Sequence, residues 1–310
     1  MPRAVEQQAA KAVLMVRPAA FASNPETLAS NAFQSAAVAT EEMAARAQTE
    51  FDAVVAALTT AGVHVCTFDG RLESDCPDEV FPNNWVSFHA DGTVVLYPML
   101  APSRRRERRR QIIDALEREH GYVIARTVDL TAHEAHERFL EGTGSLVLDR
   151  ISHVAYACRS PRTHEQVLND FADRLGYTPV AFDALDDNGR PIYHTNVVMA
   201  VGTSFAVVCL EAIADPTDRE AITHRLEDSG REIVAVELDQ MHDFAANLLE
   251  LEGRDGRVMT LSACALSALD DSQIYRLERH GKLLSVPIPT IETFGGGSLR
   301  CMLAEIHLHR

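Results

Sequence analysis

The stretch Glu292-Thr-Phe-Gly-Gly-Gly-Ser-Leu-Arg-Cys301-Met302 places three consecutive glycines just ahead of a cysteine. Glycine reaches positive φ and lets a ligand approach the main chain where a Cβ would clash. Cysteine is the side chain best able to attack an electrophilic carbon at neutral pH. An isolated cysteine is also often a small buried hydrophobic residue after a turn. The stretch makes Cys301 a candidate nucleophile, and other polar clusters must decide between the two interpretations.

Three other clusters carry polar side chains in patterns that suit a ligand site. The segment 78–85 (DEVFPNNW) contains the only tryptophan, and its paired amides equally suit a simple turn. The segment 139–145 (FLEGTGS) offers Glu141 either as a solvated acid or as an acid held beside a ligand. The segment 192–199 (IYHTNVVM) brings His194 into an apolar run, where it is either a hydrogen-bonded structural residue or a proton shuttle.

Charge and motif spacing exclude several classes of function. The formal net charge of −16 over 310 residues argues against a nucleic-acid partner, since phosphate contacts need a basic surface. The arginine-rich run 104–110 is interpreted as the solvated face of a helix over 104–119 that Ser103 caps. His133 and His136 lack the spacing of a metal-binding helix, and no P-loop or dinucleotide-binding pattern is present. The sequence predicts neither a metal nor a cofactor.

The cysteines and the N-terminal stretch bear on location. The six cysteines form no Cys-x-x-Cys pair, so we expect reduced thiols in a cytoplasmic protein. The stretch Met1–Gln8 is polar, and no apolar segment approaches the length of a membrane span. We therefore expect no membrane partner, while the oligomeric state stays open, a homo-oligomer included.

Short apolar runs alternate with helical periodicity along the chain, which is typical of an α/β or α+β protein. Strands are expected over 12–16, 63–68, 93–97, 145–148, 154–158, 197–201, 206–210, 232–237, 257–261 and 283–286. Helices are expected over 41–60, 104–119, 163–175, 215–228 and 271–279. No Pro/Ser/Gly-rich linker divides the chain, so one domain over residues 1–310 is expected. Units of about 60 residues would fit the length, but no repeat is visible at the level of residues.

Taken together, the motifs resemble the pentein, or guanidino-group-modifying, superfamily. Glu141-Gly142, His194 and a glycine-rich segment ending at Cys301 occur in the order used by arginine deiminases, dimethylarginine hydrolases and amidinotransferases. The strings FPNNW, LEGTGS and TFGGGSLRCM are most similar to the citrulline-utilisation hydrolase branch, which is related to the arginine deiminases. The resemblance implies a five-bladed pseudo-symmetric α/β propeller of ββαβ modules around a narrow substrate channel.

The resemblance also implies roles for individual residues. Cys301 would be the nucleophile, His194 the general acid and base, and Glu141 the group that orients His194 or binds a substrate nitrogen. Backbone N–H groups over 295–298 would face the oxyanion. The segment with Asp78 and Phe81 would meet the α-amino group of a small amino-acid substrate. Substrate binding at the carboxylate would fall to Arg104 and Arg162, since paired guanidinium groups hold carboxylates well. Arg104 would then point inward, while the other arginines of the run 104–110 stay solvated.

Departures from the relatives indicate the substrate. Acids expected after Phe81 are replaced by Asn83 and Asn84, the acid expected two residues after His194 is Asn196, and another is Gly144. A guanidinium cation needs facing carboxylates, whereas a neutral ureido group suits amides, which both donate and accept. We therefore expect hydrolysis of citrulline through a Cys thiolate intermediate, giving ornithine, ammonia and carbon dioxide.

Two other hypotheses stay open at this level. The same Cys-His-Glu machinery would serve an arginine or methylarginine deiminase, a dimethylarginine hydrolase or an amidinotransferase. Alternatively, the chain is a pentein that binds a ligand without catalysis, or a structural subunit, with Cys301 unreactive.

Overall fold

The computed structural model describes residues 6–71 and 76–310. Five of the residues in the polar N-terminal stretch, 1–5, therefore lie outside the described part. Fifteen strands form five sheets of three strands each. They are β1 (Ala12–Arg17), β2 (His64–Asp69), β3 (Val86–Phe88), β4 (Thr93–Leu96), β5 (Arg126–Asp129), β6 (Val147–Asp149), β7 (Val154–Cys158), β8 (Thr178–Phe182), β9 (Met199–Val201), β10 (Phe205–Val208), β11 (Glu232–Ala235), β12 (Leu249–Gly253), β13 (Gly256–Ser262), β14 (Lys282–Val286) and β15 (Ala304–Ile306).

The five sheets share one topology. In each, the middle strand pairs antiparallel with one neighbour and parallel with the other, as in β3-β4-β5 and β6-β7-β8. The parallel connection passes through at least one helix, because parallel strands need a long crossover. The sheet β15-β1-β2 completes the set by pairing the C-terminal strand with the N-terminal one, Ala12 opposite Ile306. This is the repeat that residue-level inspection of the sequence does not show.

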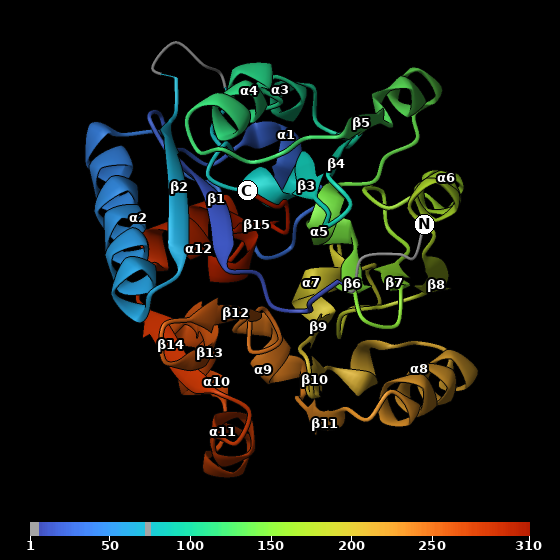
Figure 1. The fold of residues 1–310 in the computed structure, drawn as a ribbon. Helices are drawn as coiled ribbons and strands as arrows, with labels where there is room; N and C mark the ends of the chain where they lie inside the picture. The colour runs from blue at the N-terminus through green and yellow to red at the C-terminus, as the bar shows by residue number, and fades with distance from the viewer. Residues whose placement is uncertain (1–5, 72–75) are drawn as a thin grey trace.

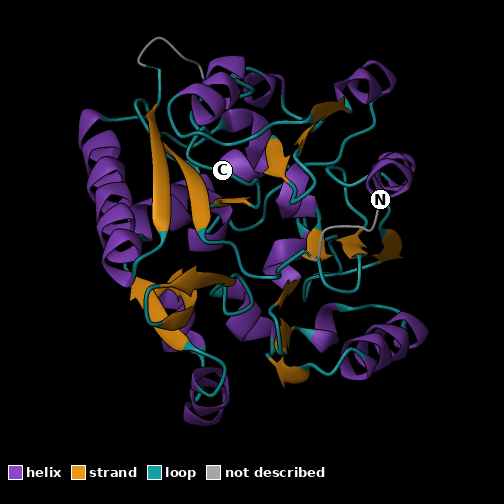
Figure 2. Cartoon of the chain, in the orientation of Figure 1, coloured by secondary structure: helices purple, strands orange, loops and turns teal. Residues whose placement is uncertain are grey.

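The sheets follow one another around the middle of the molecule in chain order, and helices lie mainly outside them (Figures 1 and 2). The helices are α1 (Pro25–Leu28), α2 (Glu41–Ala61), α3 (Pro102–Arg105), α4 (Arg110–Arg118), α5 (Gly142–Ser145), α6 (Glu165–Leu175), α7 (Thr195–Val198), α8 (Pro216–Asp228), α9 (Leu238–His242), α10 (Ala263–Ala268), α11 (Asp271–Glu278) and α12 (Pro289–Gly295). Single 3-10 turns are η1 (Pro82–Asn84), η2 (Thr131–His136), η3 (Leu210–Ala212) and η4 (Leu299–Met302).

Helix α2 shows how sequence pattern becomes packing. Thr40 caps its first turn by accepting a hydrogen bond from the Met43 N–H, and Gly62 ends it in the left-handed region. Its buried side chains recur every three or four residues, so that one face of the helix packs into a hydrophobic cluster with β1 and the C-terminal segment. The middle strands β7 and β10 are buried along their whole length.

The expected helix over 104–119 is wrong in one respect, because the chain forms two helices there. Helix α3 begins after Ala101 and ends at Arg105, and α4 starts only at Arg110. Ser103 therefore lies inside α3 rather than capping it, and its N–H donates to Glu26. The break lets Arg104 turn inward, where it is 2% exposed. The expected strand over 197–201 likewise begins as the short helix α7.

A short turn precedes the antiparallel edge strand of each sheet, and these turns position the site. They are η1 before β3, α5 before β6, α7 before β9, the segment 243–248 before β12, and η4 before β15. Contacts join η1 to η4, and α5 to both η1 and α7. Side chains from segments far apart in the sequence therefore converge on the middle of the molecule.

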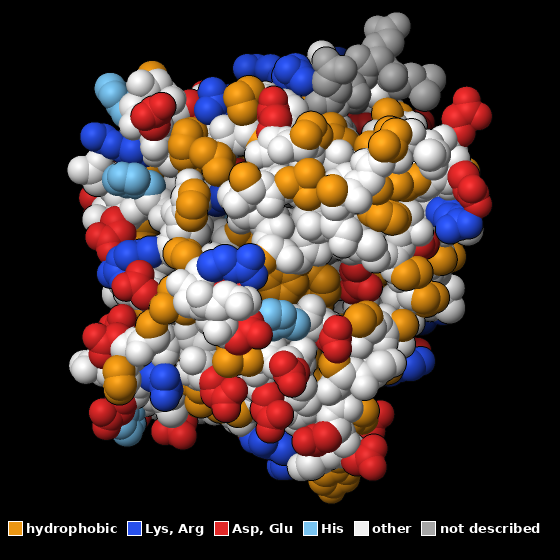
Figure 3. Space-filling model, turned by 180° about the vertical axis from the view of Figure 1, so that it is seen from behind, with side chains coloured by type: hydrophobic (Ala, Val, Ile, Leu, Met, Phe, Trp, Pro, Cys, Tyr) orange, Lys and Arg blue, Asp and Glu red, His pale blue; other side chains and the backbone are white. Residues whose placement is uncertain are grey.

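The outer surface follows the acidic composition. On the face shown in Figure 3, basic side chains lie scattered among acidic ones, which gather over its lower half. Within residues 6–71 and 76–310, no helix combines the length and apolar character needed to span a bilayer.

Candidate active site

The converging turns line a small hollow. Its walls come from the N-terminal segment around α1, from η1, from the start of α7 and from the glycine-rich turn before η4. The lining residues are Thr27, Asn31, Asp78, Phe81, Asn84, Arg104, Arg162, Tyr193, His194, Gly295, Gly296, Gly297 and Cys301. Every catalytic or binding residue that the sequence suggested either lines this hollow or contacts a residue that does, apart from Asn83, whose position is given below.

Cys301 lies in the turn η4 and is 3% exposed. Its N–H donates to the Ser298 carbonyl at 3.0 Å, which fixes the turn. Two side-chain amides meet its sulfur: Nδ2 of Asn196 and Nδ2 of Asn247 each lie 3.4 Å from Sγ. The immediate partners of the candidate nucleophile are thus neutral hydrogen-bond donors rather than charged groups.

His194 precedes α7, and its ring is buried against Tyr193, with 4.7 Å between the ring centroids. Its Nε2 lies 2.9 Å from Oε2 of Glu141. Burial lowers the pKa of His194 to about 4, although the hydrogen bond and charge of Glu141 oppose that shift. His194 is therefore neutral at physiological pH and able to accept a proton.

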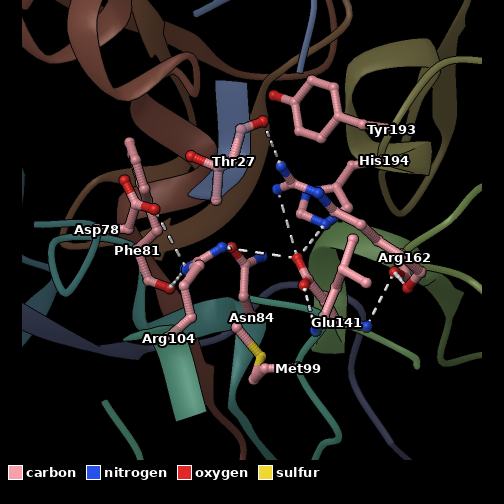
Figure 4. Close-up of polar contacts among 12 residues, drawn as sticks. Thr27, Asp78, Phe81, Asn84, Met99, Arg104, Glu141, Arg162, Tyr193 and His194 are labelled. Atoms are coloured by element: carbon pink, nitrogen blue, oxygen red, sulfur yellow. Dashed lines mark hydrogen bonds and ion pairs between the residues drawn. The ribbon is translucent and has the colours of Figure 1, made fainter. Parts of the chain in front are cut away.

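Glu141 is fully buried and lies between two guanidinium groups, as Figure 4 shows. Its Oε2 is 3.5 Å from Nη1 of Arg162 and 3.6 Å from Nη1 of Arg104. Its other oxygen accepts a hydrogen bond from the Leu100 N–H at 3.1 Å. Burial alone would raise the pKa of Glu141, but Arg162, the His194 hydrogen bond and Arg104 together hold it well below its usual range. Glu141 is thus an ionised carboxylate whose charge is already matched.

The two arginines are held by different partners. Arg104 makes a two-pronged ion pair with Glu107, at 2.9 and 3.1 Å, and donates to Oδ1 of Asn84 at 2.9 Å. Burial would lower the pKa of Arg104, but Glu107 and Asp78 raise it, so this group stays charged.

Arg162 instead donates to Oγ of Ser30 at 2.9 Å and lies over the ring of Tyr193, 5.2 Å from its centroid. Arg104 and Arg162, which we expect to bind the substrate carboxylate, both lie beside the Glu141–His194 pair, because Glu141 carries the charge that buried arginines need.

Asp78 and Phe81 line the hollow next to the arginines. Oδ2 of Asp78 accepts from Nδ2 of Asn24 at 2.7 Å, and its Oδ1 is buried without a partner in the described chain. Burial raises the pKa of Asp78 although Arg104 opposes the shift. The Phe81 ring explains part of the glycine run, since a Cβ on Gly295 would come within 2.8 Å of it.

The asparagines carry buried polar atoms that have no partner among residues 6–71 and 76–310. These atoms are both side-chain ends of Asn83, Nδ2 of Asn84 and Oδ1 of Asn196. Asn84 lines the hollow, and Asn83 is its neighbour in η1. Leaving a buried polar atom unpaired costs roughly 1–3 kcal/mol. Such atoms around a hollow indicate a polar ligand that can both donate and accept hydrogen bonds.

Gly144 keeps this arrangement open. A Cβ there would lie 2.4 Å from Nδ2 of Asn84 and 2.7 Å from Nδ1 of His194. Gly144, which stands where the relatives carry an acid, therefore occupies a place that has no room for a side chain.

We predict that Gly144→Ala lowers kcat/KM about 100-fold, since displacing a reacting group by about 1 Å has such an effect. Steady-state kinetics check this, with circular dichroism to confirm folding. Gly189→Ala is the matched control, because its Cβ would meet nothing within 4 Å. Its φ of +72° makes it a test of backbone strain alone, which should lower stability and spare activity. Unchanged kinetics in Gly144→Ala would contradict the tight fit around His194.

One site residue, Asn247, was missed by the sequence reasoning. It belongs to no recognised motif, and only the structural repeat reveals its place. Counting back from the edge strands, Asn247 stands two residues before β12 as Asn84 stands two before β3. Cys301 and Asn196 each stand three residues before their strands. The repeated turn is the signal that would have found Asn247.

A cluster of possible metal ligands lies away from the hollow. One ligand atom each of His64, Cys66 and His120 falls within 4.8 Å of the others. In the described part of the chain, no carboxylate or carbonyl orients either imidazole, whereas metal-binding histidines are usually oriented in this way. The guanidinium of Arg310 also acts electrostatically on His64 and Cys66 and would oppose a cation there. We interpret the cluster as packing at the edge of β2.

Comparison with known proteins adds a family and a set of similar folds. A family model described as N,N dimethylarginine dimethylhydrolase, eukaryotic, matches residues 17–308. No curated protein sequence matches the chain.

The N-terminal domain of ArgZ, an arginine dihydrolase from the ornithine-ammonia cycle in cyanobacteria, was solved as a variant bound to substrate. It is 17% identical with a TM-score of 0.73, over 95% of this chain and 97% of that one. AgrE in complex with L-arginine is 16% identical with a TM-score of 0.74, over 95% of this chain and 40% of that one. A dimethylarginine dimethylaminohydrolase adduct with S-methyl-L-thiocitrulline is 16% identical with a TM-score of 0.67, over 96% of this chain and 100% of that one. At these identities the likeness is one of fold.

Proposed function

The chain belongs to the N,N-dimethylarginine dimethylhydrolase family, within the pentein superfamily of guanidino-modifying enzymes, and we propose that it is a cysteine-dependent hydrolase that cleaves the ureido group of citrulline. The products would be ornithine, ammonia and carbon dioxide. The proposal includes a cytoplasmic setting, in which Cys301 stays a free thiol as it is in the structure.

We further propose that the five units are blades of one pseudo-symmetric propeller forming a single domain over residues 1–310. The repeated topology of the five sheets supports this arrangement. So does the pairing of β1 with β15, because joining the first and last strands closes the series on itself.

One observation carries the choice of substrate: the groups that meet the Cys301 sulfur are the amides of Asn196 and Asn247. Glu141, the carboxylate bonded to His194, is already paired with two arginines. An isolated buried cation costs several kcal/mol, so a guanidinium head would need a carboxylate of its own. A neutral ureido head instead offers N–H donors and a carbonyl acceptor, which amides can satisfy from both sides.

The unpartnered atoms suit the two ends of such a substrate. Nδ2 of Asn84, buried and unpaired, can donate to the ureido oxygen as negative charge develops on it. This role was expected of backbone N–H groups over 295–298. Of these groups, the Gly296 N–H already donates to the Glu292 carbonyl at 2.9 Å, so we propose Asn84 as an additional donor. At the amino-acid end, the free Oδ1 of Asp78 can accept from an α-ammonium, and Arg104 and Arg162 can bind the α-carboxylate.

The proposed reaction begins with transfer of the Cys301 proton to neutral His194, whose imidazolium form Glu141 stabilises. The thiolate attacks the ureido carbon, and a C–N bond breaks as the leaving nitrogen takes the proton from His194. This leaves a thiocarbamate on sulfur. Water, deprotonated by His194, then attacks the same carbon, the C–S bond breaks, and the carbamate released decomposes to an amine and carbon dioxide. Either ureido nitrogen can leave first with the same final products.

A second candidate is an arginine or methylarginine substrate, and one observation favours it. His194 is neutral before the substrate arrives, so a guanidinium cation would supply the positive charge that favours a thiolate. ArgZ and AgrE, the similar folds, are solved with substrate and with L-arginine. This alternative predicts citrulline as a product rather than as a reactant.

The test is to incubate the protein separately with citrulline and with arginine and to measure ornithine, citrulline and ammonia. We expect ornithine and ammonia from citrulline in equal amounts, with slower turnover of arginine. Asn196→Asp should shift the preference toward arginine, because it adds an acid beside Sγ. Absence of ornithine from citrulline, together with rapid formation of citrulline from arginine, would select the second candidate.

A further inference from the structure

The amide of Asn247 is fully buried and has two acceptors for its two hydrogens. Its Nδ2 lies 2.8 Å from the Asn196 carbonyl oxygen and 3.4 Å from Sγ of Cys301. Asn196 supplies a second donor to the same sulfur, also at 3.4 Å. One N–H of Asn247 thus anchors the amide to the backbone of α7, which leaves the other for the sulfur. Oδ1 of Asn247 lies farther from Sγ, at 3.8 Å, where it can accept from the thiol before the proton is lost.

The local backbone holds Asn247 in this orientation. The chain reverses after α9 through Phe244, whose φ of +63° is in the left-handed region. The Asn247 N–H donates to the Phe244 carbonyl at 2.8 Å, which closes a tight turn immediately before β12. A non-glycine residue at positive φ is uncommon, so the surrounding structure must hold this turn in place. The donor is therefore fixed before any substrate binds.

The charged and titratable groups around Cys301 do not replace these donors. The hollow is also lined by His194 and Tyr193, from the segment before α7, and by Asp78, Arg104 and Arg162. Arg300, the neighbour of Cys301 in η4, donates to Glu305 and to the Leu303 carbonyl. Within residues 6–71 and 76–310, the nitrogens bonded to Sγ are those of Asn196 and Asn247.

We infer that Asn247 is a further catalytic residue, a neutral donor that stabilises the Cys301 thiolate together with Asn196. This inference rests on the proposed function, because a neutral ureido substrate brings no cation to favour the anionic sulfur. When the S–H bond breaks, the proton moves to His194 and the negative charge stays on sulfur between the two amides. Hydrogen bonds to charged groups are stronger than those between neutral groups, so the pair favours the thiolate over the thiol.

The test follows alkylation of Cys301 by iodoacetamide across a pH series, read by peptide mass mapping so that the other five cysteines do not interfere. Asn247→Ala removes the donor, and we expect the midpoint for Cys301 labelling to rise by about one pH unit. Asn247→Asp retains the shape but replaces the donor with a carboxylate, and it should raise the midpoint further. A labelling midpoint that rises from wild type to Asn247→Ala and again to Asn247→Asp would not be produced by a purely structural role.

Gln240→Ala provides the matched control. Gln240 is an amide in α9, close to Asn247 in sequence, which bonds to Gln273 and to the Ala268 carbonyl rather than to Cys301. Its loss should lower the melting temperature and leave the labelling midpoint unchanged. If Asn247→Ala does not fold, the Asp variant decides. A lower melting temperature with an unmoved midpoint in the folded Asn247 variants would overturn the inference and leave Asn247 as a bridge to the Asn196 backbone.

The labelling experiment uses no substrate, so its outcome is independent of the proposed reaction. A raised midpoint in a protein that turns over only arginine would retain the role of Asn247 and reject citrulline. An unmoved midpoint in a protein that hydrolyses citrulline would retain citrulline as the substrate and reject the role of Asn247.

Discussion

Replacing Cys301 with alanine should lower citrulline turnover at least about 10⁴-fold, because the proposed reaction has no second nucleophile. Folding should survive, since the substitution removes a single buried sulfur and leaves the turn η4 with its backbone hydrogen bond. Cys301→Ser, which keeps the size but weakens the nucleophile, should be nearly as inactive. Ornithine release and a thermal melt measure the two effects.

Cys264 offers the control for this experiment. It is the exposed cysteine of the six, and its nearest polar partner is Asp243. Cys264→Ala should keep full activity. Substantial ornithine release by folded Cys301→Ala would mean that sulfur does not carry the reaction, and the covalent mechanism would have to be abandoned.

Replacing Glu141 with glutamine should damage both catalysis and stability. Catalysis should fall roughly 10³–10⁴-fold, as when the acid that orients a catalytic histidine is lost. Stability should fall by about 3 kcal/mol, because the change removes the carboxylate that faces two buried guanidinium groups. Arg104 keeps its ion pair with Glu107, whereas Arg162 keeps uncharged partners in the Ser30 hydroxyl, the Thr27 carbonyl and the Tyr193 ring. The stability effect should therefore come mainly from Arg162.

The stability part of this prediction has a definite pH dependence. The pKa of Glu141 is held well below its ordinary value of 4.5 in the folded protein. Its contribution is thus fully present above about pH 4.5, where the unfolded chain is also ionised, and is lost progressively as the pH falls below that value. Urea unfolding of the wild type and Glu141→Gln should show a gap at pH 7 that narrows under acid conditions.

A surface pair supplies the contrast. Glu165 contacts Arg159 with both side chains about half exposed, so Glu165→Gln should cost between about 0 and 1 kcal/mol and leave the kinetics unchanged. If Glu141→Gln behaved like Glu165→Gln, the buried carboxylate would be neither the orienting group for His194 nor the anchor of the arginines.

The order of motifs in the sequence selected Glu141, His194 and Cys301 as candidates, and the structure places His194 and Cys301 in one hollow with Glu141 bonded to His194. The sequence also located most middle strands, since runs such as Val154–Cys158 are continuously apolar. Periodicity missed the edge strands β3, β5, β8, β12 and β15, although the resemblance to the superfamily implied a final strand over 301–307 that contains β15. Several have only three or four residues, too few for periodicity to register, and β15 is defined by pairing with a strand almost 300 residues away.

The relative positions of charged groups were beyond sequence reasoning. That Glu141 is shared by His194, Arg104 and Arg162 depends on four separate segments of the chain meeting in space. The break between α3 and α4 was hidden because the arginine-rich run has a helical pattern throughout, yet Arg104 must leave that pattern to reach Glu141. Asn247 had no motif because its role arises from the structural repeat.

The most direct measurement is a competition in which labelled citrulline and labelled arginine are mixed in one reaction and their relative kcat/KM is read from product formation. We predict that citrulline is consumed first, with ornithine and ammonia as products. The reason is that amides surround the sulfur and that the charge of Glu141 is already neutralised by two arginines. Faster consumption of arginine, with citrulline accumulating, would contradict a site built for a neutral ureido head.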